Sequence, residues 1–150
     1  MNVYLSRDQK NQEIKTDMKL EHIGIAVSDV EETRNLFQLV FGATPYKTED
    51  VLSEGVRTHF YDAGGVKLEL LESISPDSSI ERFIKKYGPG LHHLAFAVDS
   101  AAADVDRLSA LGLRVLGEAP KLGADGKIIF FVHPKDTAGV LMEFCSPANR

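Results

Sequence analysis

Hydrophobic and polar positions repeat along this chain in two similar halves. The segment 21–27 (EHIGIAV) lines up with 92–98 (HHLAFAV) at an offset of 71 residues, and both have the length of a buried strand. Further along, 65–69 (GVKLE) lines up with 139–143 (GVLME) at an offset of 74. Self-similarity at a fixed period predicts two copies of one supersecondary unit.

Each half begins with a strand, continues with a helical apolar spacing and ends with three strand-like segments. The pairs Ser28-Asp29 and Asp99-Ser100 precede the helical stretches as candidate N-caps, and Gly42 and Gly112 follow them as candidate stops. The order βαβββ is therefore predicted twice. The first half has strands near 20–27, 44–52, 57–63 and 66–71 and a helix at 30–41; the second has strands near 91–98, 115–119, 128–133 and 140–144 and a helix at 101–111.

The predicted architecture is one α+β domain, in which two βαβββ modules pack with pseudo-twofold symmetry and form a half-barrel-like mixed sheet. Module 1 covers about 18–74, a turn-and-helix connector about 75–90, and module 2 about 91–147. One such unit would leave a sheet face uncovered, so two packed copies are the economical solution. Residues 1–17 are polar without a periodic apolar face, and we expect a flexible extension ahead of the domain at 18–150.

Composition narrows the class of protein. A chain of 150 residues with 43% hydrophobic content is the size of one globular domain. The net charge is -5 and the 17 Lys and Arg residues are scattered, which disfavours nucleic-acid binding. The sequence has neither an apolar run near the length of a membrane span nor the pattern of a signal peptide, so we expect a soluble, cytoplasmic protein. A single cysteine, Cys145, excludes an intrachain disulfide.

Two histidines and two glutamates fall at equivalent positions of the repeat. His22 aligns with His93, and each shares its strand face with small residues. Glu69 aligns with Glu143, and each points to the face opposite its apolar neighbours. A carboxylate facing the inside of a sheet is costly unless it is paired or bound to a metal. The four residues therefore predict one divalent-cation site, and the donor set suits Zn, Co, Mn, Ni or Fe without selecting among them.

The motifs around these residues resemble those of the vicinal oxygen chelate superfamily (glyoxalases, bleomycin-resistance proteins and dioxygenases), and within it those of the methylmalonyl-CoA epimerase family. The resemblance covers nearly all of the chain from Met18 to about Pro147. Its segments are HIGIAV at 22–27, ELLESISPDSSI at 69–80, GPGLHHLAFAV at 88–98 and the tail at 118–145.

The resemblance implies the site and its chemistry. His22, Glu69, His93 and Glu143 would hold one divalent metal ion per chain. The reaction would interconvert (R)- and (S)-methylmalonyl-CoA by removal and return of the α-proton, with the metal stabilising the enediolate. Glu143 is the stronger candidate for one proton-transfer group. Some family members have a glutamate at the position of Thr58, which cannot act as a base, so Glu69 or a bound water is the candidate for the other.

The acyl-CoA substrate would extend out of the metal cavity along the glycine-containing segment of module 2. Lysines there can meet phosphate or carboxylate groups, and glycines allow close approach of the backbone. A solvated lysine and a strand-end histidine are the plainer alternatives. The candidate contacts are Lys121, Gly123, Gly126, Lys127, His133 and Lys135. His59 and His92 lie off the matched set and receive no role, and a homodimer is expected because symmetric folds of this size commonly dimerise.

Two other classes of function remain open from the sequence. A glyoxalase I-type isomerase or an extradiol dioxygenase would use related metal positions on the same scaffold, although the dioxygenase needs two His and one Glu, which leaves Glu69 surplus. A metal-free binding module of the bleomycin-resistance type would need a groove and no ligands. The complete set of four donor residues argues against the metal-free module.

Overall fold

The computed structural model describes residues 18–148, and the predicted extension at 1–17 lies outside them. Module 1 contains β1 (Lys19–Val27), α2 (Val30–Phe41), β2 (Lys47–Val51), β3 (Val56–Asp62) and β4 (Lys67–Ser73). The connector forms α3 (Ser79–Tyr87). Module 2 contains β5 (Gly90–Ala97), α4 (Ala101–Ala110), β6 (Lys121–Leu122), β7 (Lys127–Val132) and β8 (Met142–Pro147), with short 3-10 helices η1 (Ala124–Gly126) and η2 (Pro134–Asp136).

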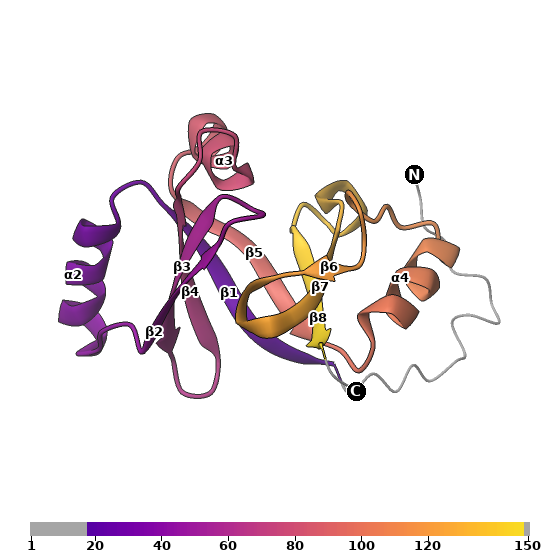
Figure 1. Cartoon of the computed structure of the whole chain (residues 1–150), viewed down its shortest axis with the longest axis horizontal. Coiled ribbons are helices and arrows are strands. Elements are labelled where there is room, and N and C mark those ends of the chain that lie inside the picture. The colour runs from indigo at the N-terminus through magenta and orange to yellow at the C-terminus, as the bar shows by residue number, and fades with distance from the viewer. Residues whose placement is uncertain (1–17, 149–150) are drawn as a thin grey trace.

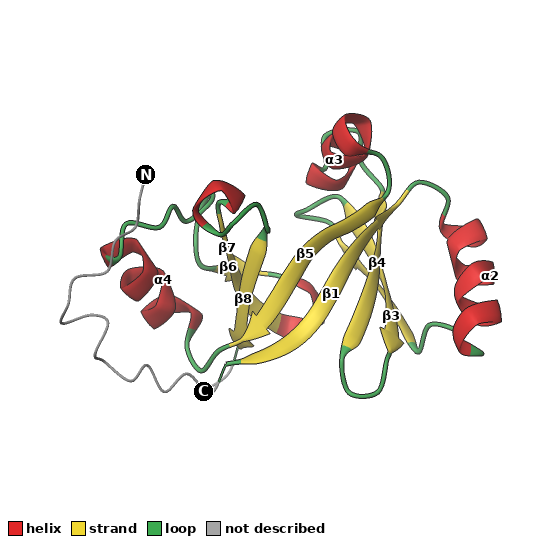
Figure 2. Cartoon of the chain, turned by 180° about the vertical axis from the view of Figure 1, so that it is seen from behind, coloured by secondary structure: helices red, strands yellow, loops and turns green. Residues whose placement is uncertain are grey.

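Within residues 18–148, eight strands form one mixed sheet in the order β2-β3-β4-β1-β5-β8-β7-β6. β1 is parallel to β4 and β5 is parallel to β8, whereas β1 and β5 run antiparallel side by side at the centre (Figure 2). The strand order on one side of the β1–β5 junction mirrors the order on the other. Figure 1 shows the sheet curling between α2 and α4, which lie at opposite ends of the molecule. The predicted pair of βαβββ modules in a half-barrel sheet is confirmed.

The helices of the two modules begin and end where the sequence predicts, within one residue. Asp29 accepts a hydrogen bond from the Glu32 N–H at 2.9 Å, and Ser100 accepts one from Ala103 N–H at 3.2 Å. Gly42 ends α2 in the left-handed region with φ 65°, where a side chain would be strained.

The core of module 2 lies between α4 and the sheet. Leu108 of α4 packs with Phe130, Val132 and Phe144, and the rings of Phe130 and Phe144 stack with centroids 5.0 Å apart. Burial of these apolar side chains is the main contribution to the stability of this half.

The helix of module 1 is packed less deeply. No residue of α2 is fully buried, and its contact with the sheet is made by Val30 and Phe37 against a cluster that includes Tyr61. Leu39 is 85% exposed and Val40 is 63% exposed on the outer side of this helix. The two helices therefore differ in how much apolar area they bury, although they occupy equivalent places in the repeat.

The predicted strand at 115–119 is wrong. Val115 forms only an isolated bridge to Val132, after which Gly117 turns the chain with φ 61°. Pro120 has no N–H to donate to a neighbouring strand, so pairing does not resume until the two-residue strand β6. The second strand of module 2 is thereby reduced to β6, and a loop takes the place of most of it.

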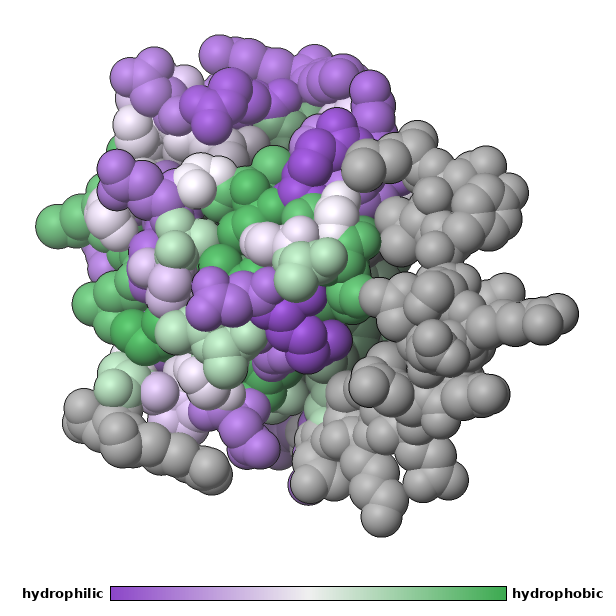
Figure 3. Space-filling model, turned by 90° about the vertical axis from the view of Figure 1, so that its right-hand side faces the viewer, coloured by the Kyte–Doolittle hydropathy of each residue, from purple (hydrophilic) through white to green (hydrophobic). Residues whose placement is uncertain are grey.

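No helix within residues 18–148 combines the length and apolar character that a membrane crossing requires. The end of the molecule viewed in Figure 3 shows apolar residues interspersed among polar ones. Leu116 and Leu122 are among the exposed apolar side chains of module 2.

Candidate metal centre

The two histidines meet at the central strand pair. His22 lies on β1 and His93 on β5, and their Nε2 atoms are 3.0 Å apart with the rings edge to face. The register places Gly24 opposite His93. A Cβ at position 24 would lie 2.2 Å from the ring of His93, so only glycine leaves room for this imidazole. The expectation that small residues make space beside each histidine holds at this position.

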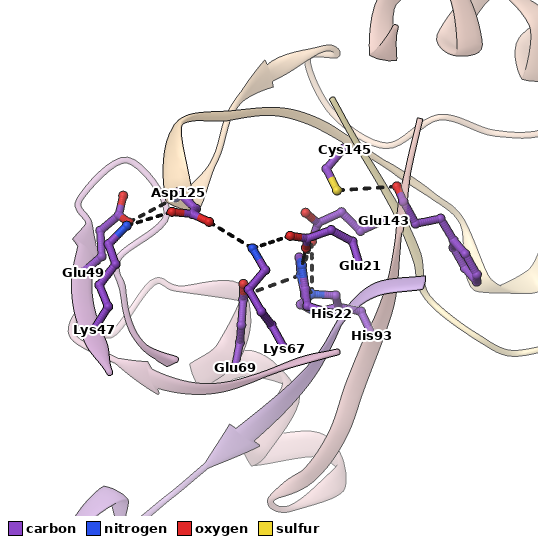
Figure 4. A network of polar contacts seen from close by, with 11 residues as sticks. Glu21, His22, Lys47, Glu49, Lys67, Glu69, His93, Asp125, Glu143 and Cys145 are labelled. Atoms are coloured by element: carbon purple, nitrogen blue, oxygen red, sulfur yellow. Dashed lines mark hydrogen bonds and ion pairs between the residues drawn. The ribbon is translucent and has the colours of Figure 1, made fainter. Parts of the chain in front are cut away.

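The two glutamates reach the same point from the flanking strands. Glu69 on β4 and Glu143 on β8 each place Oε2 3.5 Å from His22 Nε2, and Glu143 Oε2 is also 3.0 Å from His93 Nε2. All four residues are at most 6% exposed. Figure 4 shows their side chains converging from both modules. The structure therefore brings together the four residues that the repeat selected.

The surroundings of the two glutamates give them opposite protonation preferences. Burial raises the pKa of Glu69 to about 7, because the attraction of His22 and Lys67 does not offset desolvation and the charges of Glu143 and Glu21. Burial also raises the pKa of Glu143, but the contacts with His22 and His93 outweigh it and lower the pKa to about 2. For His22, burial lowers the pKa, whereas Glu143, Glu21 and Glu69 together raise it to about 10.

The donor set fits a divalent cation. Ligand atoms of His22, Glu69 and His93 all lie within 4.8 Å of one another, and Glu143 contacts both histidines. Imidazole nitrogens and carboxylate oxygens are the ligands of Zn²⁺, Mn²⁺, Co²⁺ and Fe²⁺ sites. This arrangement can also hold two carboxylates around one reacting carbon, which is what acid–base chemistry at that carbon requires.

A second group of side chains with metal-binding atoms lies beside the first and shares His22 with it. Atoms of Glu21, His22 and Cys145 also lie within 4.8 Å of one another. Burial, with the charges of Glu21 and Glu143, raises the pKa of the Cys145 thiol to about 12. The Sγ of Cys145 donates a hydrogen bond to the carbonyl oxygen of Phe96 at 3.4 Å, so this buried thiol already has a backbone partner.

Glu21 and His92 were not assigned to the site from the sequence. Each of them contacts the Nδ1 atom of one of the two histidines. Glu21 accepts a hydrogen bond from His22 Nδ1, and Nδ1 of His92 lies 2.9 Å from Nδ1 of His93. Simple alternation along a strand turns Glu21 and His92 away from the metal face. The register between β1 and β5 shifts at two bulges, which re-aim both residues. Burial and the neighbouring His93 lower the pKa of His92 to about 4, so this residue is neutral at pH 7.

The cavity around the site has about 640 Å³ of non-atom space, including solvent at its mouth. Among the predicted acyl-CoA contacts, Gly123 and Lys127 line it, and Lys121 pairs at 2.7 Å with Glu54, which also lines it. The position of Gly123 has a packing reason as well, since a Cβ there would lie 2.7 Å from the buried side chain of Ile129.

The remaining predicted contacts lie outside the set of residues that line this cavity in the described part of the chain. Gly126 is in the loop beside it and turns with φ 63°. His133 accepts a hydrogen bond from Lys135 N–H at 3.1 Å and thereby caps η2, and Lys135 is exposed. For His133 the structure shows a local capping role.

Thr58 faces the cavity from β3 and is 2% exposed. Its neighbour His59 points elsewhere and contacts Glu72 at 3.0 Å and Thr48 at 3.3 Å. The hydroxyl of Thr58 adds no titratable group to this wall of the cavity. The titratable groups that line this cavity in the described part of the chain therefore come from other residues, among them the four converging ones.

A row of ion pairs ties the η1 loop of module 2 to module 1 (Figure 4). Asp125 accepts from Lys47 Nζ and Lys67 Nζ at 2.9 Å each, and its N–H donates to Glu49 at 3.0 Å. Lys67 also donates to Glu21, so the row reaches the neighbours of His22. The η1 loop, which joins β6 to β7, is thus fastened across one side of the cavity.

Comparison with known proteins agrees with this geometry. The family model of the Glyoxalase/Bleomycin resistance protein/Dioxygenase superfamily matches residues 21–131. The chain is 38% identical over 127 residues to the ethylmalonyl-CoA/methylmalonyl-CoA epimerase of Cereibacter sphaeroides, covering 83% of this chain and 95% of that protein. It is 39% identical over 129 residues to the uncharacterized protein YqjC of Bacillus subtilis, covering 86% and 92%.

A solved structure of methylmalonyl-CoA epimerase in complex with methylmalonyl-CoA and NH4+ superposes with a TM-score of 0.80 at 34% identity, covering 88% of this chain and 96% of that one. The sequence match and the shared fold extend over the whole two-module unit. The chain therefore belongs to the Glyoxalase/Bleomycin resistance protein/Dioxygenase superfamily and, within it, to the methylmalonyl-CoA epimerase family, whose members are isomerases.

Proposed function

We propose that the protein is a metal-dependent epimerase that interconverts (R)- and (S)-methylmalonyl-CoA. The observation that carries the proposal is the convergence of His22, Glu69, His93 and Glu143 in one cavity of a chain whose relatives act on this substrate. These four residues would hold the cation. When bound, the cation would supply Lewis-acid stabilisation of negative charge on the thioester and carboxylate oxygens of the substrate.

The two glutamates would move the proton. Glu143 is ionised at neutral pH, so its carboxylate accepts the α-proton, and the C–H electron pair passes into the thioester carbonyl. Glu69, which approaches from module 1, would return a proton to the opposite face of the same carbon. One carboxylate comes from each module. A substrate carbon held between Glu69 and Glu143 would therefore have one carboxylate on each of its two faces. Return of the proton on the other face inverts the centre.

Thr58 makes this assignment more specific. No hydroxyl with the ordinary acidity of threonine accepts a carbon-bound proton, so β3 supplies no base to the cavity. Glu69 is the titratable carboxylate that approaches the site from the same module. We therefore assign Glu69 as the second proton-transfer group rather than a water molecule.

The acyl-CoA substrate would place its malonyl end at the four residues and extend past the η1 loop. Lys127 lines the cavity and Lys121 pairs with Glu54 of its lining, and both lysines would meet anionic groups of the substrate. Gly126, His133 and Lys135 stay predicted contacts for the part of the CoA moiety that leaves the cavity.

A homodimer is part of the proposal. The outer side of α2 exposes three consecutive apolar residues, Leu39, Val40 and Phe41, each at least 55% exposed. A second copy of the chain would remove this apolar area from water. Size-exclusion chromatography with light scattering would show the mass of two chains, and a monomeric mass at micromolar concentration would contradict the dimer.

The reaction is tested by incubating (R)- or (S)-methylmalonyl-CoA with metal-loaded protein in deuterium oxide. We expect the α-position to gain one deuterium, seen by mass spectrometry, together with the appearance of the other epimer. Removal of the metal with a chelator should stop both, and re-addition should restore them. Absence of exchange in protein shown to contain the metal would contradict the proposed reaction.

A further inference from the structure

We infer that Glu21 and His92 are a matched pair of positioning residues, one in each module, that fix the ring orientation and the tautomer of the two histidines of the site. The inference rests on the proposed cation site. It assigns a role to two residues that donate nothing to the cavity centre themselves.

The two residues occupy equivalent places in the repeat and in the sheet. Glu21 and His92 are related by the same offset of 71 that relates His22 to His93. Each is the extra, unpaired residue of a bulge in the β1–β5 ladder. A bulge turns a side chain that alternation would point away, so both residues can reach the imidazole that follows them. Both central strands therefore have the same local structure, in which a bulged residue precedes the histidine of the site.

His22 is held by a carboxylate. Its Nε2 faces the cavity, 3.5 Å from Glu69 and Glu143, while its Nδ1–H donates to Glu21. A metal-binding His22 is neutral, and the contact with Glu21 then keeps its one proton on Nδ1 and leaves the lone pair of Nε2 directed at the site. Glu21 is held in turn by Lys67 Nζ, which also bonds Asp125. A carboxylate acceptor of this kind orients a metal-binding histidine and raises its basicity.

His93 is held by an imidazole. The 2.9 Å contact between Nδ1 of His93 and Nδ1 of His92 can contain only one proton. His93 Nε2 has its lone pair free for the site only when His93 donates this proton and His92 accepts it. The ring of Phe83 lies edge to face against His92 with centroids 4.8 Å apart and fixes the acceptor in place.

The pair differs in strength. A hydrogen bond to an ionised acceptor is about twice as strong as one between neutral groups, so Glu21 orients His22 more firmly than His92 orients His93. Loss of an outer partner of a metal-binding histidine weakens metal affinity by about 10- to 100-fold. We expect Glu21→Ala to lie near the upper end of that range and His92→Phe near the lower end.

The test measures Co²⁺ affinity by chelator competition and the visible absorption spectrum of the Co²⁺-loaded full chain. The variants are Glu21→Ala, Glu21→Gln and His92→Phe, with thermal melting to verify folding. Glu21→Gln keeps an amide oxygen for Nδ1–H, so it should restore part of the affinity lost in Glu21→Ala. Asp125→Asn is the matched control, because it removes the other carboxylate of Lys67 without touching His22.

We expect the dissociation constant to rise about 100-fold in Glu21→Ala and about 10-fold in His92→Phe, with changed Co²⁺ spectra. It should stay within about twofold in Asp125→Asn. Folded Glu21→Ala and His92→Phe proteins with the affinity and spectrum of the unsubstituted chain would overturn the inference. If the unsubstituted chain itself bound no Co²⁺, the proposed cation site would fail, and this inference with it.

Discussion

The two modules place the same kinds of atom at the site but surround them differently. Glu69 and Glu143 occupy equivalent strands and are equally buried, yet the pKa of Glu69 is about 7 and that of Glu143 is about 2. Glu143 contacts both histidines, whereas Glu69 contacts only His22, at 3.5 Å. The repeat supplies the symmetric donors, and the different neighbours of the two carboxylates give them opposite protonation preferences.

The scaffolds of the two modules diverge as well. In module 2, α4 buries Leu108 in an aromatic core, while most of the second strand is replaced by a loop. In module 1 the strands are complete, while α2 buries no residue fully. Module 1 is therefore irregular in the packing of its helix, and module 2 in its sheet. The central strands β1 and β5, which carry the histidines, are similar in both halves.

The largest difference between the modules should appear when Glu143 loses its charge. Glu143→Gln removes the base that contacts both histidines. For the epimer whose α-proton faces Glu143, we expect the rate of exchange to fall by about 10²- to 10⁴-fold. Exchange is measured by mass spectrometry at saturating metal, with bound metal quantified. Glu72→Gln, outside the cavity lining, is the control for loss of a glutamate charge. A loss of less than about tenfold would be too small for a general base and would refute its assignment.

Glu69→Gln should have a different effect from Glu143→Gln. Loss of one proton-transfer group stops inversion but leaves the other group able to exchange the α-proton of one epimer. We therefore expect one epimer to gain deuterium without conversion, while conversion falls by about 10²-fold. The measurement follows both epimers separately in deuterium oxide. Equal loss of exchange and inversion for both epimers would contradict the division of roles.

The two helices should respond unequally to truncation. Leu108 is 6% exposed in the core of module 2, so Leu108→Ala should lower the free energy of unfolding by about 2–5 kcal/mol. Leu39 on α2 is 85% exposed, and Leu39→Ala should change it by less than about 0.5 kcal/mol in the monomer. Urea unfolding below the dimer concentration measures both. Similar values for the two variants would mean that α2 is packed as deeply as α4.

The smallest effect should come from the ion pairs across the cavity. Lys47 and Lys67 lower the pKa of Asp125 to about 2, from an ordinary value near 3.8. A lowered pKa means that the native state favours the carboxylate, so the stabilisation is complete above pH 4 and disappears as the pH falls through 2. Asp125→Asn should cost about 0.5–1 kcal/mol at pH 7, since the group is partly exposed.

Urea unfolding of both proteins across this range checks the pH dependence. The difference in unfolding free energy between the wild type and Asp125→Asn should close between pH 4 and pH 2. A difference that persisted unchanged at pH 2 would show that the amide is strained in the loop and that the lost charge is not the cause.

Much of the site could be predicted because each residue lies on a strand whose side chains alternate. The repeat alignment selected His93 over His92 and paired Glu69 with Glu143, and the structure places all four together. The same alternation rule misplaced Glu21 and His92, because nothing in single-sequence periodicity indicates a bulge. The alignment itself held the missing signal, since these two positions are also equivalent in the repeat.

The wrong prediction of a strand at 115–119 has a different cause. The apolar residues there fit a strand, but Gly117 and Pro120 prevent continuous pairing, and this turn chemistry overrides propensity. The contacts of Asp125 with Lys47 and Lys67 join residues more than fifty positions apart, so local patterns carry no information about them. Contacts between modules become visible only once the topology is known.

The central claim is that both modules complete one cation site, and metal stoichiometry tests it most directly. Purified chain loaded with Zn²⁺ and freed of excess metal should contain one ion per chain, and His22→Ala and His93→Ala, one from each module, should each lose most of it while remaining folded. The contradictory result would be a variant that keeps one ion per chain, because a single module would then be sufficient.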